Sequence, residues 1–177
     1  MQNQQIILIH GKNHKQMTKQ LLQAAGLADE IGSRDTPVAL KPNLVIGAPA
    51  SRGATTHPEL VAGVLEYLQE NGFRDLRVIE GSWVGSRTSE AVQTSGLLDV
   101  CRQYRVPFID LQKDASASYD AKGMQIKVCN EAMRPGFLIN MPVLKGHGQT
   151  LITCCEDARI AERTGGRVLT VANGGIR

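Results

Sequence analysis

The chain has 177 residues, of which 42% are hydrophobic, 21% charged and 4% aromatic, and its formal net charge is +3. This length suits one full domain and leaves little room for two. A weak charge without a basic run interleaved with aromatic residues argues against nucleic-acid binding. No apolar run reaches the roughly 18 residues of a membrane span. The N-terminus also lacks the basic start of a signal peptide, so we predict a cytoplasmic protein.

Strands and helices are predicted to alternate from the start of the chain. Residues 6–10 form an apolar, β-branched run typical of a strand, and Asn13 is the expected N-cap of a helix that ends near Gly26. A second strand is predicted over residues 37–46. Pro42 should lie at its end or at a bulge, because proline cannot donate a hydrogen bond to a central ladder.

The best-marked element of the sequence is a helix that follows the loop 47–54, which is rich in Gly, Ala, Pro and Ser. Thr56, Pro58 and Glu59 form the pattern of a capping box with an early proline, and Asn71-Gly72 is expected to end the helix. Between these signals, apolar residues recur at helical spacing and form one stripe. This stripe predicts a helix with one buried face.

The remaining elements continue the alternation. We expect a strand over 76–80, a helical region over 86–105 interrupted near Gly96, a strand over 106–111, an edge or hairpin strand over 124–128 after a turn at 121–123, and a last strand over 137–144. This order predicts an α/β fold with a mostly parallel sheet and helices on both faces.

Polar residues at the ends of these strands form the candidate site, because ligands of open α/β sheets bind beyond the carboxyl ends of the strands. Lys41, Asn43, Thr55 and Thr56 follow the second strand, and the two threonines stand at a helix N-terminus that attracts anions. An unpaired buried lysine is costly, so Lys41 must meet water, an anion or a carboxylate. The alternative is that these are ordinary loop residues, with Thr56 capping its helix.

The segment Lys145-Gly146-His147-Gly148-Gln149-Thr150 is the sharpest local pattern. Gly146 and Gly148 allow the backbone to approach a ligand, His147 suits an acid/base role, and Lys145 suits an anion. The segment lacks the third glycine of a dinucleotide fingerprint. The chain also has no Walker loop, GxSxG elbow or HExxH motif, so those reaction classes are set aside.

The four cysteines form no CxxC pair and are expected to be free thiols. The neighbouring Cys154 and Cys155 would supply only two ligands to a soft metal, which makes a poor site. We therefore predict no metal ligands and assign no cofactor or oligomeric state.

Several stretches together resemble the bacterial and archaeal family called domain of unknown function 362. They are VALKPNLV (38–45), ATTHPELVAGVLEYLQENG (54–72), VIEG (78–81), FIDL (108–111) and FLINMPVLKGHGQTLITC (137–154). The resemblance implies an α/β domain over residues 1–154. Some members of the family carry a ferredoxin-like segment and are named iron–sulfur proteins, whereas this chain has no such cysteine cluster.

A more distant similarity links the strand-Lys-Gly-His-Gly pattern to the N-terminal domain of lactate racemase-like enzymes, which use a nickel pincer nucleotide. His147 matches a functional histidine of that group. The position ten residues later, where those enzymes have a lysine, is Asp157 here. A second essential histidine of that group would fall near Ser82 and Trp83, where this chain has no histidine. The similarity therefore supports His147 and does not support the nickel chemistry.

The family pattern stops near Cys154. Residues 155–177, with glycine pairs at 165–166 and 174–175, form an atypical tail. We predict that the chain is truncated or frame-shifted at this point and that the domain is incomplete at its C-terminus. Translation of the other two reading frames past Cys154 tests this prediction.

The leading functional hypothesis is an enzyme-like domain that binds a small anionic ligand or a phosphorylated cofactor. Its acid/base is His147, and Lys41 and Lys145 hold the anion. Two alternatives remain open. The chain is a non-catalytic metal-binding or iron–sulfur redox-partner module, or it is an inactive fragment.

Overall fold

The computed structural model of the protein describes residues 5–144, 167–169, 171–172 and 175–176. The helices are α1 (His14–Ala24), α2 (Leu27–Ile31), α3 (Pro58–Glu70), α4 (Thr88–Thr94), α5 (Leu97–Tyr104) and α6 (Asn130–Met133), with a 3-10 turn at Ala50–Arg52. The strands are β1 (Gln5–Ile7), β2 (Val38–Pro42), β3 (Leu76–Glu80), β4 (Phe108–Asp110), β5 (Ser116–Ala121), β6 (Met124–Cys129), β7 (Phe137–Met141), β8 (Arg167–Leu169), β9 (Val171–Ala172) and β10 (Gly175–Ile176).

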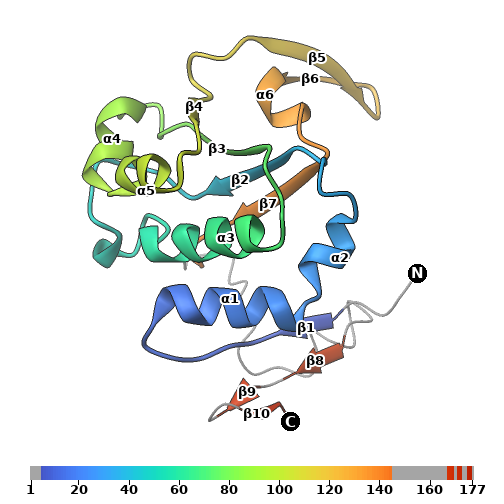
Figure 1. Cartoon of the computed structure of the whole chain (residues 1–177). Coiled ribbons are helices and arrows are strands. Elements are labelled where there is room, and N and C mark those ends of the chain that lie inside the picture. The colour runs from blue at the N-terminus through green and yellow to red at the C-terminus, as the bar shows by residue number, and fades with distance from the viewer. Residues whose placement is uncertain (1–4, 145–166, 170, 173–174, 177) are drawn as a thin grey trace.

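A four-stranded parallel sheet in the order β4-β3-β2-β7 is the centre of the fold. The chain runs from β2 outward through β3 to β4 and then returns to the other side of β2 as β7. The sheet therefore has a topological switch point between β2 and β7. The predicted α/β class with a parallel sheet flanked by helices is confirmed (Figure 1).

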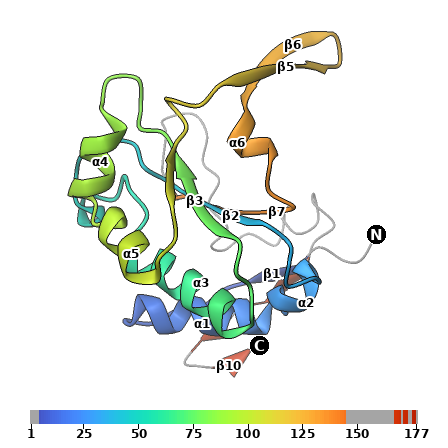
Figure 2. The ribbon, with the colours of Figure 1, turned by 45° about the horizontal axis from the view of Figure 1, so that its top comes forward.

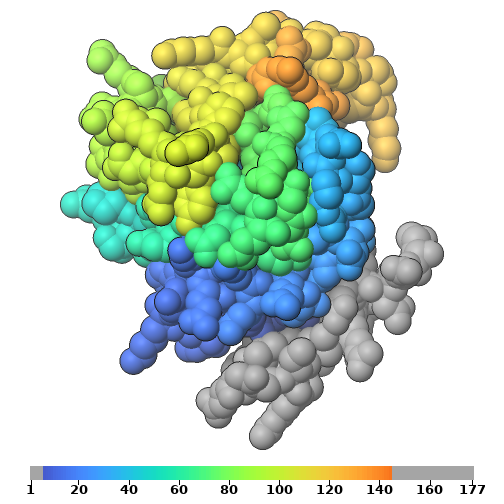
Figure 3. All heavy atoms as spheres, viewed as in Figure 1, coloured from blue at the N-terminus to red at the C-terminus, as the bar shows by residue number. Residues whose placement is uncertain are grey.

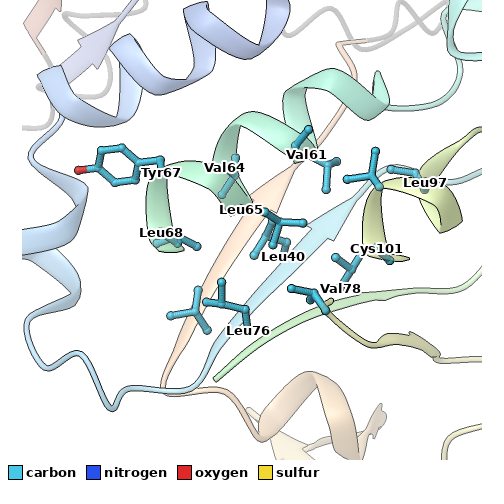
Figure 4. Close-up of a cluster of buried hydrophobic side chains, with 14 of the residues drawn as sticks. Leu40, Val61, Val64, Leu65, Tyr67, Leu68, Leu76, Val78, Leu97 and Cys101 are labelled. Carbon is cyan, nitrogen blue, oxygen red and sulfur yellow. The ribbon is translucent and has the colours of Figure 1, made fainter. Parts of the chain in front are cut away.

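One face of the sheet packs on α3 and α5. Leu40, Val64, Leu65 and Val78 converge there with the side chains of α5 and are buried (Figure 4). Because strand residues alternate between faces, Arg77 points to the opposite face, where it pairs with Glu131 of α6 at 3.3 Å. Helices thus contact the sheet from both faces, and the apolar stripe predicted for α3 lies on the core.

The first strand is the main difference from the expected sheet. β1 pairs in parallel with β8, and Figure 1 shows this pair beyond α1, away from the central strands. α1 itself packs on α3, so a helix layer separates β1 from the sheet. A short apolar run does not reveal which strand it will pair with, and this explains the difference.

Several predicted boundaries are confirmed, whereas β2 ends at Pro42 and β7 at Met141, before the predicted ends at 46 and 144. The side chain of Asn13 caps α1 by accepting the Gln16 amide at 3.0 Å, Pro42 is the last residue of β2, and Gly96 separates α4 from α5. The expected capping box of α3 is wrong. The N-cap is His57, which makes no side-chain capping bond, and the Thr56 hydroxyl bonds elsewhere.

The second strand of the hairpin was expected, and its partner β5 was not. β5 and β6 pair antiparallel around Lys122 and Gly123, both with positive φ, as a tight hairpin turn requires. Figures 1 and 2 show the hairpin extending away from the sheet, and Figure 3 shows its residues along the upper rim. β5 is largely exposed, and its alternating apolar positions hold only alanine and tyrosine with no β-branched residue, so its strand pattern is weak.

Candidate functional site at the carboxyl edge of the sheet

The ends of β2 and β7 meet the start of α3 through one hydroxyl group. Thr56 Oγ1 accepts the Asn43 backbone N–H at 2.8 Å and donates to the Met141 carbonyl at 2.7 Å. The Thr56 N–H in turn donates to the Asn43 carbonyl at 2.9 Å. The Asn43 side-chain amide donates to the Ala54 carbonyl. Thr56 and Asn43 therefore build the switch point, and their polar groups are largely committed to it.

Lys41 and Glu80 form an ion pair between neighbouring strands at the same edge. Lys41 Nζ lies 2.7 Å from Glu80 Oε2, and the Glu80 side chain is only 10% exposed. Burial raises the pKa of the Glu80 carboxyl, against the opposing effect of Lys41. Of the three partners that sequence allowed for Lys41, the structure places a carboxylate beside it. Its charge is thereby offset, although its own side chain remains 37% exposed.

Thr55 is the unusual residue of this edge. It is only 1% exposed, and its Oγ1 has no hydrogen-bond partner among the described residues. Buried polar side chains of native proteins are nearly always paired, so an unpaired buried hydroxyl calls for an explanation. Thr55 immediately precedes Thr56 and lies three residues before the first residue of α3.

The second half of the predicted site lies outside the described residues. This applies to Lys145, Gly146, His147 and Gly148, and the described chain continues from the end of β7 only to Leu144. Their assignment stays a prediction.

The polar residues after β3 form a separate, internally satisfied network. The Ser82 N–H donates to Thr88 Oγ1 at 3.1 Å, the Ser82 hydroxyl donates to the Ser86 carbonyl at 2.8 Å, and Gln112 Nε2 donates to the Ser82 carbonyl at 2.7 Å. Ser82 and Thr88 are buried. These contacts fix the loop that follows β3, and they use the polar groups of Ser82 and Thr88 within the loop.

A group of side chains that was not expected from the sequence gathers at the N-termini of α1 and α3. The ligand atoms of His14, His57 and Glu59 all lie within 4.8 Å of one another. The two imidazole rings are 4.6 Å apart between centroids, and His57 Nδ1 lies 3.8 Å from Glu59 Oε2. Beside this group is a hollow of about 400 Å³, lined by Lys12, Asn13, His14, Lys15 and Glu59.

The close approach of α1 to α3 brings these residues together. A Cβ atom added at Gly63 of α3 would lie 2.7 Å from Thr18 Cβ and 2.8 Å from the Lys15 carbonyl oxygen, so the helices could not approach as closely with any other residue. Lys15 and Lys19 also pair with Glu66 at 2.6 and 2.9 Å. A histidine at the start of each of two helices is visible in the sequence, but nothing there shows that the two helices are neighbours.

The described cysteines show no sign of reactivity or cluster binding. Cys101 is buried in the core, and this burial raises the pKa of its thiol to about 11. Its thiol therefore stays protonated at neutral pH, as expected for a structural cysteine. Cys129 is a free, partly buried residue at the end of β6.

The comparisons with known proteins agree with the resemblance seen in the sequence. The family described as domain of unknown function (DUF362) matches residues 38–156. The chain belongs to this family. The match includes the whole central sheet, the Thr55–Thr56 segment and His147, whereas β1, α1 and His14 precede it.

A curated relative is the thylakoid-associated protein sll1697 of Synechocystis sp., which is 28% identical over 116 residues. The alignment covers 66% of this chain and 36% of the relative, so the chain spans about a third of that protein. No solved structure matches the chain. The more distant similarity to lactate racemase-like enzymes stays a prediction. Among the described residues, no helix is both long enough and apolar enough to cross a membrane.

Proposed function

We propose that this domain binds a small anionic ligand or a phosphorylated cofactor at the carboxyl edge of the sheet, beside the switch point between β2 and β7. In this proposal His147 is the acid/base and Lys145 binds the anion. Gly146 and Gly148 let the backbone approach the ligand. The family assignment names no ligand and no reaction, so this proposal goes beyond it.

The observation that carries the proposal is the hydroxyl of Thr55, which is unpaired within the described ranges of the chain. The hydroxyl is buried beside the end of β2, where ligands of open α/β sheets bind, and next to the N-terminus of a 13-residue helix. A bound anion would supply the missing acceptor, and the free N–H groups at the start of α3 would favour the same charge.

The Lys41–Glu80 pair changes the role of Lys41. Because Glu80 offsets its charge, Lys41 contributes less attraction for an anion than an unpaired lysine would. We infer that Glu80 orients the half-exposed Lys41 side chain and that Lys145 supplies most of the positive charge. Lys41→Met should therefore weaken binding less than Lys145→Met.

Calorimetric titration with inorganic phosphate, and with a panel of small carboxylates and nucleotides, tests the proposal. Thr55→Val should abolish or strongly weaken binding without a loss of stability, because the hydroxyl has no hydrogen-bond partner in the described part of the chain. The matched control is Thr88→Val. That hydroxyl is buried and bonded, so this variant should lose stability and keep the ligand. Unchanged binding by Thr55→Val would contradict the proposal.

His147→Ala tests the second half of the site. It should leave folding intact and abolish binding of the same ligand, whereas His10→Ala, a substitution of an exposed histidine, should change neither. A His147→Ala variant that binds like the wild type would remove His147 from the proposal.

A cytoplasmic location remains part of the proposal. The printed name of the Synechocystis relative associates that protein with thylakoids. Cell fractionation followed by detection of the protein tests the location, and recovery in the membrane pellet would overturn it.

A further inference from the structure

We propose that His14, His57 and Glu59 bind a divalent transition-metal ion of the Zn²⁺ type and leave one coordination position open toward the adjoining hollow. Its ligands are not residues of the site proposed at Thr55 and His147, although both sites adjoin the N-terminus of α3. One ligand, His14, precedes the region matched by the family. The site was not predicted from the sequence.

The donor set is the first argument. Two imidazole nitrogens and one carboxylate oxygen are borderline ligands that suit zinc and its neighbours, and three protein ligands with one open position are typical of reactive zinc sites. The three ligand atoms come from two segments 43 residues or more apart in the chain, yet they lie within 4.8 Å of one another. Their meeting follows from the packing of α1 on α3.

The geometry needs only a small adjustment. Metal–ligand bonds of about 2.0–2.1 Å place tetrahedral ligands about 3.4 Å apart. His57 Nδ1 and Glu59 Oε2 are already 3.8 Å apart, with side chains that are 40% and 61% exposed. Rotation of these side chains is enough to close the remaining distance, because neither is held by packing on all sides.

The backbone that carries the ligands is, in contrast, well supported. The Asn13 side chain caps α1, and the Thr18 hydroxyl donates to the His14 carbonyl at 2.9 Å. Gly63 keeps the two helices close, and Lys15 pairs with Glu66 beside the group. Because the backbone is already fixed and only side chains must rotate, a metal ion can bind with a small loss of conformational entropy.

The charges around the site indicate what completes it. Lys12 and Lys15 line the hollow, and both helices present their N-termini to it, although Glu66, 2.6 Å from Lys15, offsets part of the charge of that lysine. These groups repel an isolated cation and attract an anion. A carboxylate or phosphate group in the open position would relieve the repulsion, so we infer that metal and anion bind cooperatively.

The test is a titration of the full chain, stripped of metal with chelator, with Co²⁺ followed by visible absorption and with Zn²⁺ followed by calorimetry. One ion should bind, with the intense visible bands of four-coordinate Co²⁺. His14→Ala, His57→Ala and Glu59→Gln should each weaken binding by about tenfold or more. Added inorganic phosphate should tighten the wild-type affinity, and loss of this effect in Lys12→Met would identify the cation involved.

Three controls separate this site from others in the chain. His10→Ala, a neighbouring exposed histidine, and Glu70→Gln, an acid at the other end of α3, should bind metal like the wild type. A Cys154→Ser/Cys155→Ser variant should also retain it. Circular dichroism establishes that each variant is folded. The proposal is overturned if His14→Ala and His10→Ala bind equally well, or if only the cysteine variant loses the metal.

Discussion

The two sides of α3 are built on different principles. The side toward the sheet is apolar, with Val61, Leu65 and Leu68 fully buried. The side toward α1 has a glycine at the closest contact and the carboxylate of Glu66, which bonds two lysines of α1. The first side is held by burial of apolar area and the second by close backbone approach and charge. The difference shows why the apolar pattern predicts the core but not the neighbour of the helix.

Leu65→Ala should produce the largest effect, because it empties space on the sheet side. Leu65 is fully buried between α3 and the sheet (Figure 4). Replacement of a buried leucine by alanine lowers the free energy of unfolding by about 2–5 kcal/mol. Denaturation in urea measures the loss. A loss below about 1 kcal/mol would show that this side of α3 is not the core.

Gly63→Ala tests the opposite side of the same helix. Alanine normally stabilises a helix interior relative to glycine, yet here its methyl group would collide with Thr18 and the Lys15 carbonyl. We expect a loss of about 1–3 kcal/mol through displacement of α1. Ala62→Gly is the neighbouring control for helix propensity. If Gly63→Ala stabilises the protein instead, the close approach of the helices is wrong.

Glu66→Gln removes the charge that links α1, α3 and α5. Hydrogen bonds from Lys15, Lys19 and the Tyr104 hydroxyl lower the pKa of the Glu66 carboxyl to about 2. We expect a loss of about 1 kcal/mol at neutral pH. Because the carboxyl pKa is lower in the folded than in the unfolded chain, this stabilisation is complete above about pH 5 and is lost as the pH falls through about 2.

The measurement for Glu66 is therefore a pair of unfolding curves at several pH values. The difference between wild type and Glu66→Gln should be constant from pH 7 to about pH 5 and should shrink at lower pH. A difference that does not vary with pH would assign the effect to packing and not to charge.

Ile126→Thr in the hairpin should have the smallest effect. Ile126 is 44% exposed on β6, which extends away from the sheet. A substitution at such a position changes stability by no more than about 0.5 kcal/mol. A larger loss would show that the hairpin is covered by another part of the protein or by a partner.

The same contrast explains how far the sequence could be interpreted. β3 and α3 were predicted nearly residue by residue, and β2 and β7 were predicted at the right places but extended four and three residues too far, since burial on the sheet fixes the pattern but not the strand end. β5 was missed because it is largely exposed and its alternating apolar positions hold only alanine and tyrosine. The capping box of α3 was misassigned because Thr56 bonds to Asn43, just after β2, and to Met141 of β7. That bond is between segments 85 residues apart, which no local motif can reveal.

Some features of the candidate site could also be predicted from the sequence, and others could not. The sequence grouped Lys41, Asn43, Thr55 and Thr56 at one edge of the sheet, and in the structure they lie at the end of β2 and before the start of α3. It could not show that Glu80 offsets Lys41, or that the Thr55 hydroxyl has no partner among residues the structure describes, where the Thr56 hydroxyl has two. The meeting of His14 with His57 depends on helix packing, for which Gly63 was the only local sign.

The bridge made by Thr56 has a consequence for motion at this edge. The Asn43 amide lies beyond the end of β2, in a segment that would ordinarily exchange its hydrogen rapidly with water. Its bond to the Thr56 hydroxyl, which in turn bonds to β7, should slow this exchange to the rate of the central strands. A ligand that binds beside Thr55 would then meet a surface already held in place, and its affinity would not be reduced by the entropy of ordering that surface.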